Sequence, residues 1–273
     1  MRVGVVQLCS GDDPAKNLPA TVGLVRQAAS AGATFVLTPE VTNCVSTSGI
    51  RQHEVLRTEA HDETLECLRT EAEKAGIWLL IGSLALKPDD TRGRFVNRSL
   101  LIDPLGNVAA RYDKIHMFDV DVSETESYRE SAGYRPGSKS VLAKVDGTDV
   151  GLSICYDIRF PHLYRALAKA GARFLTVPSA FSPVTGRSHW EVLLRARAIE
   201  NGCFVIAPAQ SGQNTPKRAT YGHSLVVSPW GEVIADGGTD PGITLVDLDL
   251  ADVERSRQRI PSLAHDREFD GPA

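Results

Sequence analysis

The chain has 273 residues, of which 42% are hydrophobic and 23% charged, an ordinary composition for a globular protein. Its formal net charge is −4 at pH 7, and no stretch concentrates lysine and arginine as a nucleic-acid-binding surface would. The longest apolar run, IWLLIGSLAL at 77–86, is about half the length of a membrane-spanning helix. Neither a nucleic acid nor a membrane is therefore expected as a partner.

The cysteines and histidines indicate neither disulfides nor a metal. A chain of this size needs no disulfides, and its five cysteines are widely spread without a C-x-x-C pair: Cys9, Cys44, Cys67, Cys155 and Cys203. The start of the chain does not resemble an export signal, because Gln7 interrupts its apolar run and two aspartates follow. We therefore expect free thiols and a cytoplasmic location. The seven histidines lack zinc-binding spacings, so no metal is expected.

Strand-like and helical patterns alternate along the first half. Strands are predicted at 2–8 and 34–40, and between them a helix begins at Asp13-Pro14 and runs toward Ala31. A second helix is predicted at 62–75, where apolar residues recur on one face. The following elements are a strand at 77–86, a hairpin at 95–114 that turns at 103–106, and a polar long loop at 121–140.

The second half repeats this alternation. After a strand at 149–155, Pro161 is suited to the first position of a helix. A longer helix is predicted from Ser188 as N-cap, with Glu191 completing a capping box and Gly202 ending the helix. The other predicted elements are strands at 173–181 and 203–209, a hairpin at 222–238 that turns at 228–231, and a strand at 242–250.

The two hairpins resemble each other, which suggests pseudo-symmetric halves. Helices alternating with strands and hairpins favour an α/β fold of mixed sheets with helices on their outer faces. Since no low-complexity linker divides the chain, a single domain over residues 1–273 is predicted. Its charged end, about 255–273, is expected to fray or to pack against a partner subunit.

Three reactive residues follow predicted strands, where active sites of α/β sheets concentrate. Glu40, Lys114 and Cys155 supply a carboxylate, an ammonium and a thiol. Taken singly they could be a solvated acid, a surface ion pair and a packed thiol. Taken together they suit thiol chemistry, because Glu40 can accept the thiol proton and Lys114 can stabilise a thiolate and an oxyanion. The N–H of Tyr156, at the turn after the strand, can be a second oxyanion donor.

These motifs resemble the carbon–nitrogen hydrolase (nitrilase) superfamily over essentially the whole chain. LTPE carries Glu40, RYDKIHMFDVDV carries Lys114, and CYDIRFPHLYRALAKAGA carries Cys155. The resemblance implies a Glu–Lys–Cys triad and a second glutamate between Lys and Cys, here Glu130 of YRES, which alone could be a solvated loop acid. It also implies a four-layer α-β-β-α sandwich, assembled as a homodimer or larger homo-oligomer.

The carboxy-terminal half resembles the branch that contains deaminated glutathione amidase and omega-amidase, on PSAFSPVTGRSHWEVLLRARAIENGCFVIAPAQSG, KRATYGHSLVVSPWGEV and RIPSLAHDR. The resemblance implies that Arg159 binds a substrate carboxylate, although an ion pair with Asp157 or a neighbouring helix is the alternative. His116, Phe118 and Phe181 are candidate substrate-binding residues that could equally be packing residues. Trp190 is expected in the core or at a subunit interface.

The expected reaction is hydrolysis of an amide of a small carboxylate-bearing substrate, through a Cys155 thioester, to an acid and ammonia. It needs neither a metal nor an organic cofactor. Hydrolysis of an omega-amide or an N-carbamoyl amino acid remains open, as do nitrile hydrolysis and a non-catalytic binding protein that retains the fold.

Overall fold

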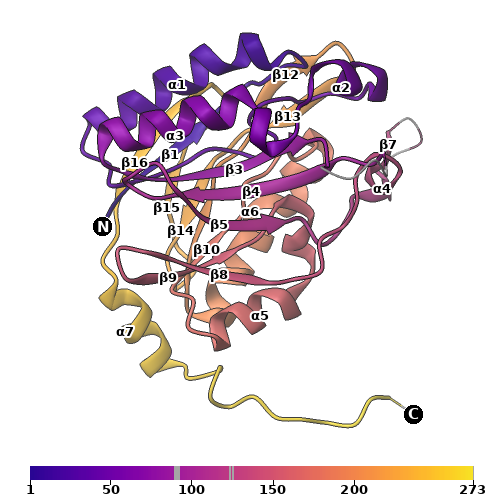
Figure 1. Cartoon of the computed structure of the whole chain (residues 1–273). Coiled ribbons are helices and arrows are strands. Elements are labelled where there is room, and N and C mark those ends of the chain that lie inside the picture. The colour runs from indigo at the N-terminus through magenta and orange to yellow at the C-terminus, as the bar shows by residue number, and fades with distance from the viewer. Residues whose placement is uncertain (89–92, 123, 125, 273) are drawn as a thin grey trace.

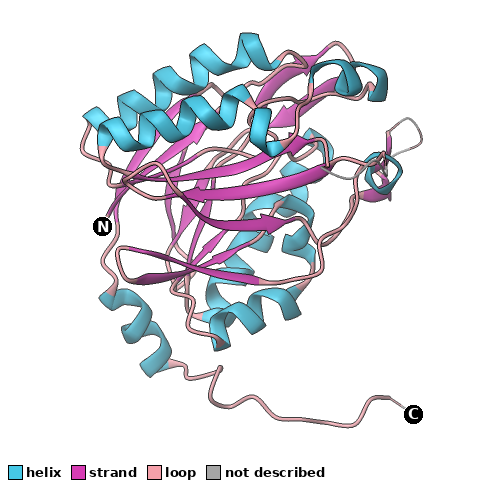
Figure 2. Cartoon of the chain, viewed as in Figure 1, coloured by secondary structure: helices cyan, strands magenta, loops and turns pink. Residues whose placement is uncertain are grey.

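The computed structural model describes residues 1–88, 93–122, 124 and 126–272, which contain two six-stranded sheets packed between helices (Figures 1 and 2). Helices α1 (Pro14–Ser30) and α3 (Glu63–Ala75) cover one sheet. Helices α5 (Pro161–Lys169) and α6 (Pro183–Asn201) cover the other. This is the four-layer α-β-β-α arrangement expected from the sequence.

The first sheet consists, in spatial order, of β16 (Gly242–Asp247), β1 (Arg2–Gln7), β2 (Phe35–Leu37), β3 (Trp78–Leu86), β4 (Val96–Ile102) and β5 (Val108–Asp113). The second consists of β15 (Val233–Asp236), β14 (Leu225–Val227), β11 (Phe204–Ala207), β10 (Phe174–Thr176), β9 (Thr148–Leu152) and β8 (Val141–Val145). In each, three parallel strands lie between an antiparallel hairpin and one antiparallel strand. The two halves therefore have matching topology, as the paired hairpins suggested.

The central strands are buried on both faces because helices cover one side and the other sheet covers the other. In β1, Val3 and Val5 join the core shared by the sheets, whereas Val6 packs into the core under α1 and α3. Gly82 of β3 lies where the halves meet. A Cβ there would lie 2.0 Å from the carbonyl oxygen of Thr38 and 2.5 Å from Cβ of Pro178, so this close approach requires glycine.

The region 121–140 is more structured than the predicted loop. β6 (Asp119–Asp121) pairs with β7 (Ser127–Arg129), and α4 (Glu130–Gly133) follows directly; residues 123 and 125 lie outside the described residues. The prediction missed these short elements because the two strands alternate between exposed and half-buried residues and carry no apolar pattern, whereas residues 135–140 are irregular as predicted. Other elements that were not predicted are α2 (Gly49–Val55), the 3₁₀ turn η1 (Glu59–His61), β8, and the hairpin of β12 (Ser211–Thr215) and β13 (Arg218–Tyr221).

Helix α6 begins six residues earlier than predicted. Ser182 is its N-cap and accepts a hydrogen bond from the Val184 N–H, and Pro183 occupies the first position. Ser188 therefore lies inside the helix, and the predicted capping box was wrong. A serine followed by proline is a strong helix start. Gly202, with φ of +54°, ends the helix as predicted.

The charged end of the chain is partly helical. α7 (Ala251–Arg259) covers its first residues, and the segment after it contacts α5 through Ser262 before the tail leaves the body of the molecule (Figure 1). Asp266 forms ion pairs with Arg165 and Lys169 of α5, whereas Phe269 is 89% exposed. Across the described ranges, no helix combines the length and the apolar character needed to cross a membrane.

Candidate active site

Cys155 lies on a strained turn between a strand and a helix. β9 ends at Leu152, and Cys155 is the first residue of a 3₁₀ turn, η2 (Cys155–Arg159), that leads into α5. Its φ is +48°, a conformation that costs a non-glycine residue free energy and is often found at functional sites. Its N–H donates to the carbonyl of Pro178 at 3.0 Å, which holds the turn against the segment after β10.

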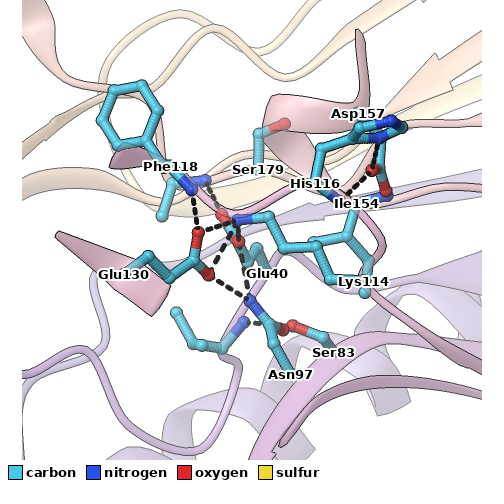
Figure 3. Close-up of polar contacts among 12 residues, drawn as sticks. Glu40, Ser83, Asn97, Lys114, His116, Phe118, Glu130, Ile154, Asp157 and Ser179 are labelled. Carbon is cyan, nitrogen blue, oxygen red and sulfur yellow. Dashed lines mark hydrogen bonds and ion pairs between the residues drawn. The ribbon is translucent and has the colours of Figure 1, made fainter. Parts of the chain in front are cut away.

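Lys114 connects two carboxylates beside this turn (Figure 3). Its Nζ lies 2.9 Å from Oε1 of Glu40 and 2.9 Å from each carboxylate oxygen of Glu130. Glu40 follows β2, Lys114 follows β5, and Glu130 begins α4, so the first half of the chain supplies all three. The side chains of Lys114 and Glu40 are almost fully buried, at 2% and 6% exposure. Neither Glu40 nor Glu130 is thus a solvated loop acid.

Asn97, Ala180 and the backbone of Phe118 hold the two carboxylates, a role that the sequence predicted for none of them. Asn97 Nδ2 of β4 donates to Oε1 of Glu40 at 2.9 Å and lies 3.4 Å from Oε1 of Glu130. The Ala180 N–H donates to Oε2 of Glu40 at 2.9 Å, and the Phe118 N–H donates to Oε2 of Glu130 at 2.6 Å. Asn97 could have been found as a buried polar residue in an apolar strand. The backbone donors leave no signal in the sequence.

Electrostatics assign a charge to each member of this cluster. Burial opposes the charge on Glu40, but the Lys114 ammonium brings the pKa of that carboxyl below its ordinary value. Burial also disfavours an ammonium, yet Glu130 and Glu40 together raise the pKa of Lys114 well above its ordinary value. Burial, with the charge of Glu40, raises the pKa of the Cys155 thiol. At neutral pH the site therefore combines a neutral thiol with an ionised carboxylate that can accept its proton.

The candidate substrate-binding residues lie on neighbouring elements. The ring of Phe118 is 5.0 Å from that of Tyr156, and Phe181 is 7% exposed. The guanidinium of Arg159 lies over Tyr156 and Phe181, and its Nη2 is 3.1 Å from Nδ1 of His189 on α6. Arg159 thus contacts the neighbouring helix α6 through an imidazole and forms no ion pair with Asp157, whose oxygens have other partners.

Two further residues flank this group. Tyr128, with its ring 5.0 Å from Phe118, carries the guanidinium of Arg218 over its own ring, 4.7 Å from the centroid. Arg218 also donates to the Ala180 carbonyl at 2.6 Å. Neither was predicted as a site residue, although the KRATYGHS motif contains Arg218.

His116 is engaged away from these aromatic residues. Its Nδ1 lies 2.6 Å from Oδ1 of Asp157, and its ring stacks on Phe160 with centroids 3.5 Å apart. Trp190 is 1% exposed and its indole N–H donates to the His223 carbonyl, so it belongs to the core.

The chain is similar to known proteins over almost its whole length. A family profile described as "Carbon-nitrogen hydrolase" matches residues 2–258. A deaminated glutathione amidase from Yersinia enterocolitica is 37% identical over 268 residues, which cover 97% of this chain and 92% of that protein. The structure of the C. elegans NitFhit protein matches with a TM-score of 0.91 and 37% identity over 97% of this chain, which spans 65% of that longer protein. An amidase variant from Nesterenkonia sp. AN1, which carries acrylamide added at its active site cysteine, matches with a TM-score of 0.78 and 27% identity, covering 96% of this chain and 98% of that one.

Proposed function

This chain belongs to the carbon–nitrogen hydrolase family, and we propose that it is an amidase in which Glu40, Lys114 and Cys155 cleave the C–N bond of a small carboxylate-bearing substrate. The observation that carries this proposal is a cysteine on a strained turn together with a buried glutamate that Lys114, Asn97 and the Ala180 N–H hold by hydrogen bonds. That pair can generate the nucleophile at the moment of attack.

The reaction begins when Cys155 attacks the amide carbon and Glu40 takes the thiol proton. Lys114 and the Tyr156 N–H stabilise the oxyanion, and Glu40 then protonates the departing nitrogen. A thioester remains, and a water deprotonated by Glu40 attacks it, which breaks the C–S bond and releases the free acid. Glu40 then returns the proton to the Cys155 thiolate. Glu130 keeps Lys114 charged and placed beside Glu40. Each step uses groups of this chain and water.

Deaminated glutathione is the preferred substrate class, because the Yersinia relative has that activity in its name. Arg159 is the proposed anchor for a substrate carboxylate, with Phe118, Phe181 and Tyr156 beside it. His116 contacts Asp157 and would affect substrate binding only by positioning the loop that carries Lys114 and Phe118. Omega-amides and N-carbamoyl amino acids are the alternative substrates, and nitriles are a weaker one.

A variant at the proposed nucleophile tests the activity. Cys155→Ala should fold normally and lose at least about a thousandfold in kcat, because no thioester can form. Cys9→Ser, at an exposed cysteine, is the matched control and should keep wild-type activity. A slow amide substrate should leave an acyl group on Cys155 by mass spectrometry. An acyl group on Cys203, or activity retained by Cys155→Ala, would contradict the proposal.

The substrate is tested by turnover of deaminated glutathione, α-ketoglutaramate, α-ketosuccinamate and N-carbamoyl amino acids. Ammonia is the product to measure with primary amides. Deaminated glutathione contains only secondary amides, so its cleavage would release an amine and not the ammonia expected from the sequence, and that amine is the product to measure. A preference for α-ketoglutaramate or α-ketosuccinamate would favour the omega-amidase alternative, and a preference for N-carbamoyl amino acids would favour the N-carbamoyl alternative.

A further inference from the structure

Asp157 is a fully buried carboxylate that contacts both sides of the proposed site. Its exposure is 0%. Oδ2 accepts hydrogen bonds from the Tyr112 hydroxyl at 2.6 Å and from the Ile154 N–H at 2.9 Å. Oδ1 lies 3.0 Å from the His116 N–H and 2.6 Å from its Nδ1, which must carry its proton toward this carboxylate. Each oxygen is thus held by two donors.

The donors to the Asp157 carboxylate come from segments of both sheets. Tyr112 and His116 lie two residues before and two residues after Lys114, at the end of β5 in the first sheet. Ile154 directly precedes Cys155, at the end of the second sheet's β9. One side chain therefore connects the segment that carries the ammonium to the turn that carries the thiol (Figure 3).

The same contacts support the strained backbone at Cys155. The Asp157 side chain accepts from the Ile154 N–H while the Asp157 N–H donates to the Ile154 carbonyl, so the residue directly before the nucleophile is tied to the residue two positions after it. A positive φ at a non-glycine residue persists only where its surroundings enforce it. Asp157 supplies part of that enforcement.

We propose that Asp157 is a positioning residue, which sets the Lys114 ammonium against the Cys155 thiol through Tyr112, His116 and Ile154. Its lone pairs are already directed at these donors, so it neither transfers protons nor binds substrate. This inference rests on the proposed function for the chemistry that it assists. The contacts themselves concern the placement of Lys114 and Cys155 in the resting protein.

Tyr112→Phe is the variant that tests the connection. It removes one hydrogen bond to Asp157 and keeps a buried ring. Tyr164→Phe is the matched control, because Tyr164 is equally buried and its 2.6 Å hydrogen bond goes to Ser153 Oγ, near Cys155, and not to Asp157. Both variants should be folded, as checked by urea denaturation.

The two variants should differ in turnover and in thiol reactivity. Tyr112→Phe should lower kcat roughly tenfold and leave KM within about twofold, because the loss falls on the arrangement of the reacting groups. The rate of alkylation of Cys155 by iodoacetamide, followed on its peptide by mass spectrometry, should fall by a similar factor. Tyr164→Phe should change each quantity less than about twofold.

Asp157→Asn extends the test. It replaces one carboxylate oxygen with an NH2 group, which would face two hydrogen-bond donors and could accept from neither, so it should cost more activity than Tyr112→Phe. If Tyr112→Phe and Tyr164→Phe match in kcat and in alkylation rate, Asp157 serves stability alone and the proposal is overturned. Alkylation requires no turnover. A failure of the amidase assignment would therefore appear as an inactive wild type, with the alkylation comparison still deciding the role of Asp157.

Discussion

Glu40 keeps its charge in a buried site because donors from distant parts of the chain converge on it. Lys114 and Asn97 donate to one oxygen and the Ala180 N–H to the other. A carboxylate that accepts such hydrogen bonds is stabilised in its ionised form against the cost of burial. The base of the proposed reaction is therefore already ionised at neutral pH, and the thiol can remain protonated until the substrate arrives.

This arrangement predicts the acid side of the pH profile. The pKa of Glu40 lies below the ordinary value of 4.5, and protonation removes the base, so kcat/KM should fall only as the pH drops below that value. Asn97→Ala removes a donor to the ionised form and should move the decline to higher pH. Steady-state rates between pH 3.5 and 8 measure both profiles, with intrinsic fluorescence as a check that the fold persists. A wild-type decline centred near pH 6 would contradict the assignment of Glu40 as the base.

At the scale of elements, the start of α6 holds the β6–β7 hairpin, which precedes Glu130 in the chain. Ser182 accepts from the Val184 N–H and donates through Oγ to Oε1 of Glu126 at 2.6 Å. Glu126 also accepts from the Tyr128 hydroxyl at 2.6 Å. The residue that caps the helix therefore also anchors the β6–β7 hairpin, and that hairpin leads directly into Glu130.

A matched pair of serine variants tests this start of α6. Ser182→Ala should lower the free energy of unfolding by about 1 to 2 kcal/mol, because the helix loses its cap and Glu126 loses a donor. Ser188→Ala, on the exposed surface inside the helix, should change it by less than about 0.5 kcal/mol. Urea denaturation followed by circular dichroism measures both. Equal losses, or a larger loss for Ser188→Ala, would place the helix start elsewhere.

The elements that could be predicted from sequence are those with a local signal. The buried run of β3, the periodic face of α3 and the proline at the start of α5 each have one, and the structure confirms all three elements. Strands β6, β7, β12 and β13 are short and partly exposed, so their pairing depends on neighbours rather than on apolar pattern.

The candidate site divides in the same way. The sequence shows that Glu40, Lys114 and Cys155 are chemically reactive residues at the ends of predicted strands. The structure brings the three segments that carry them together. Their supporting contacts join residues far apart in sequence: Asn97 is 57 residues from Glu40, and Ala180 is 140 residues from it. No local pattern encodes such pairs, because the folded sheets create them.

At the scale of the whole molecule, the outer face of α6 bears on association. Val192 and Ile199 lie seven residues apart on one face of this helix and are 66% and 53% exposed. Exposed apolar side chains that share one face of a helix can contribute to a protein interface. This face is consistent with the expectation of a homodimer or larger homo-oligomer.

The association is tested by charged substitutions. The wild type should sediment with at least twice the monomer mass, and the double variant Val192→Glu/Ile199→Glu should shift it to the monomer, because burying two carboxylates in an apolar interface is costly. Leu105→Glu, at an equally exposed leucine in the β4–β5 turn, is the control and should leave the mass unchanged. A monomeric wild type would contradict this prediction.

The pairing of β1 with β16 has a consequence for folding during synthesis. Arg2 to Gln7 lie opposite Asp247 to Gly242, and the Met1 ammonium donates to the Leu248 carbonyl at 3.0 Å. During translation, at roughly 5 to 20 residues per second, the edge of β1 that pairs with β16 stays unpaired for some tens of seconds. An open apolar edge is a site of mispairing between nascent chains. Chaperone dependence and losses to aggregation during synthesis should therefore be concentrated in chains that have not yet reached β16.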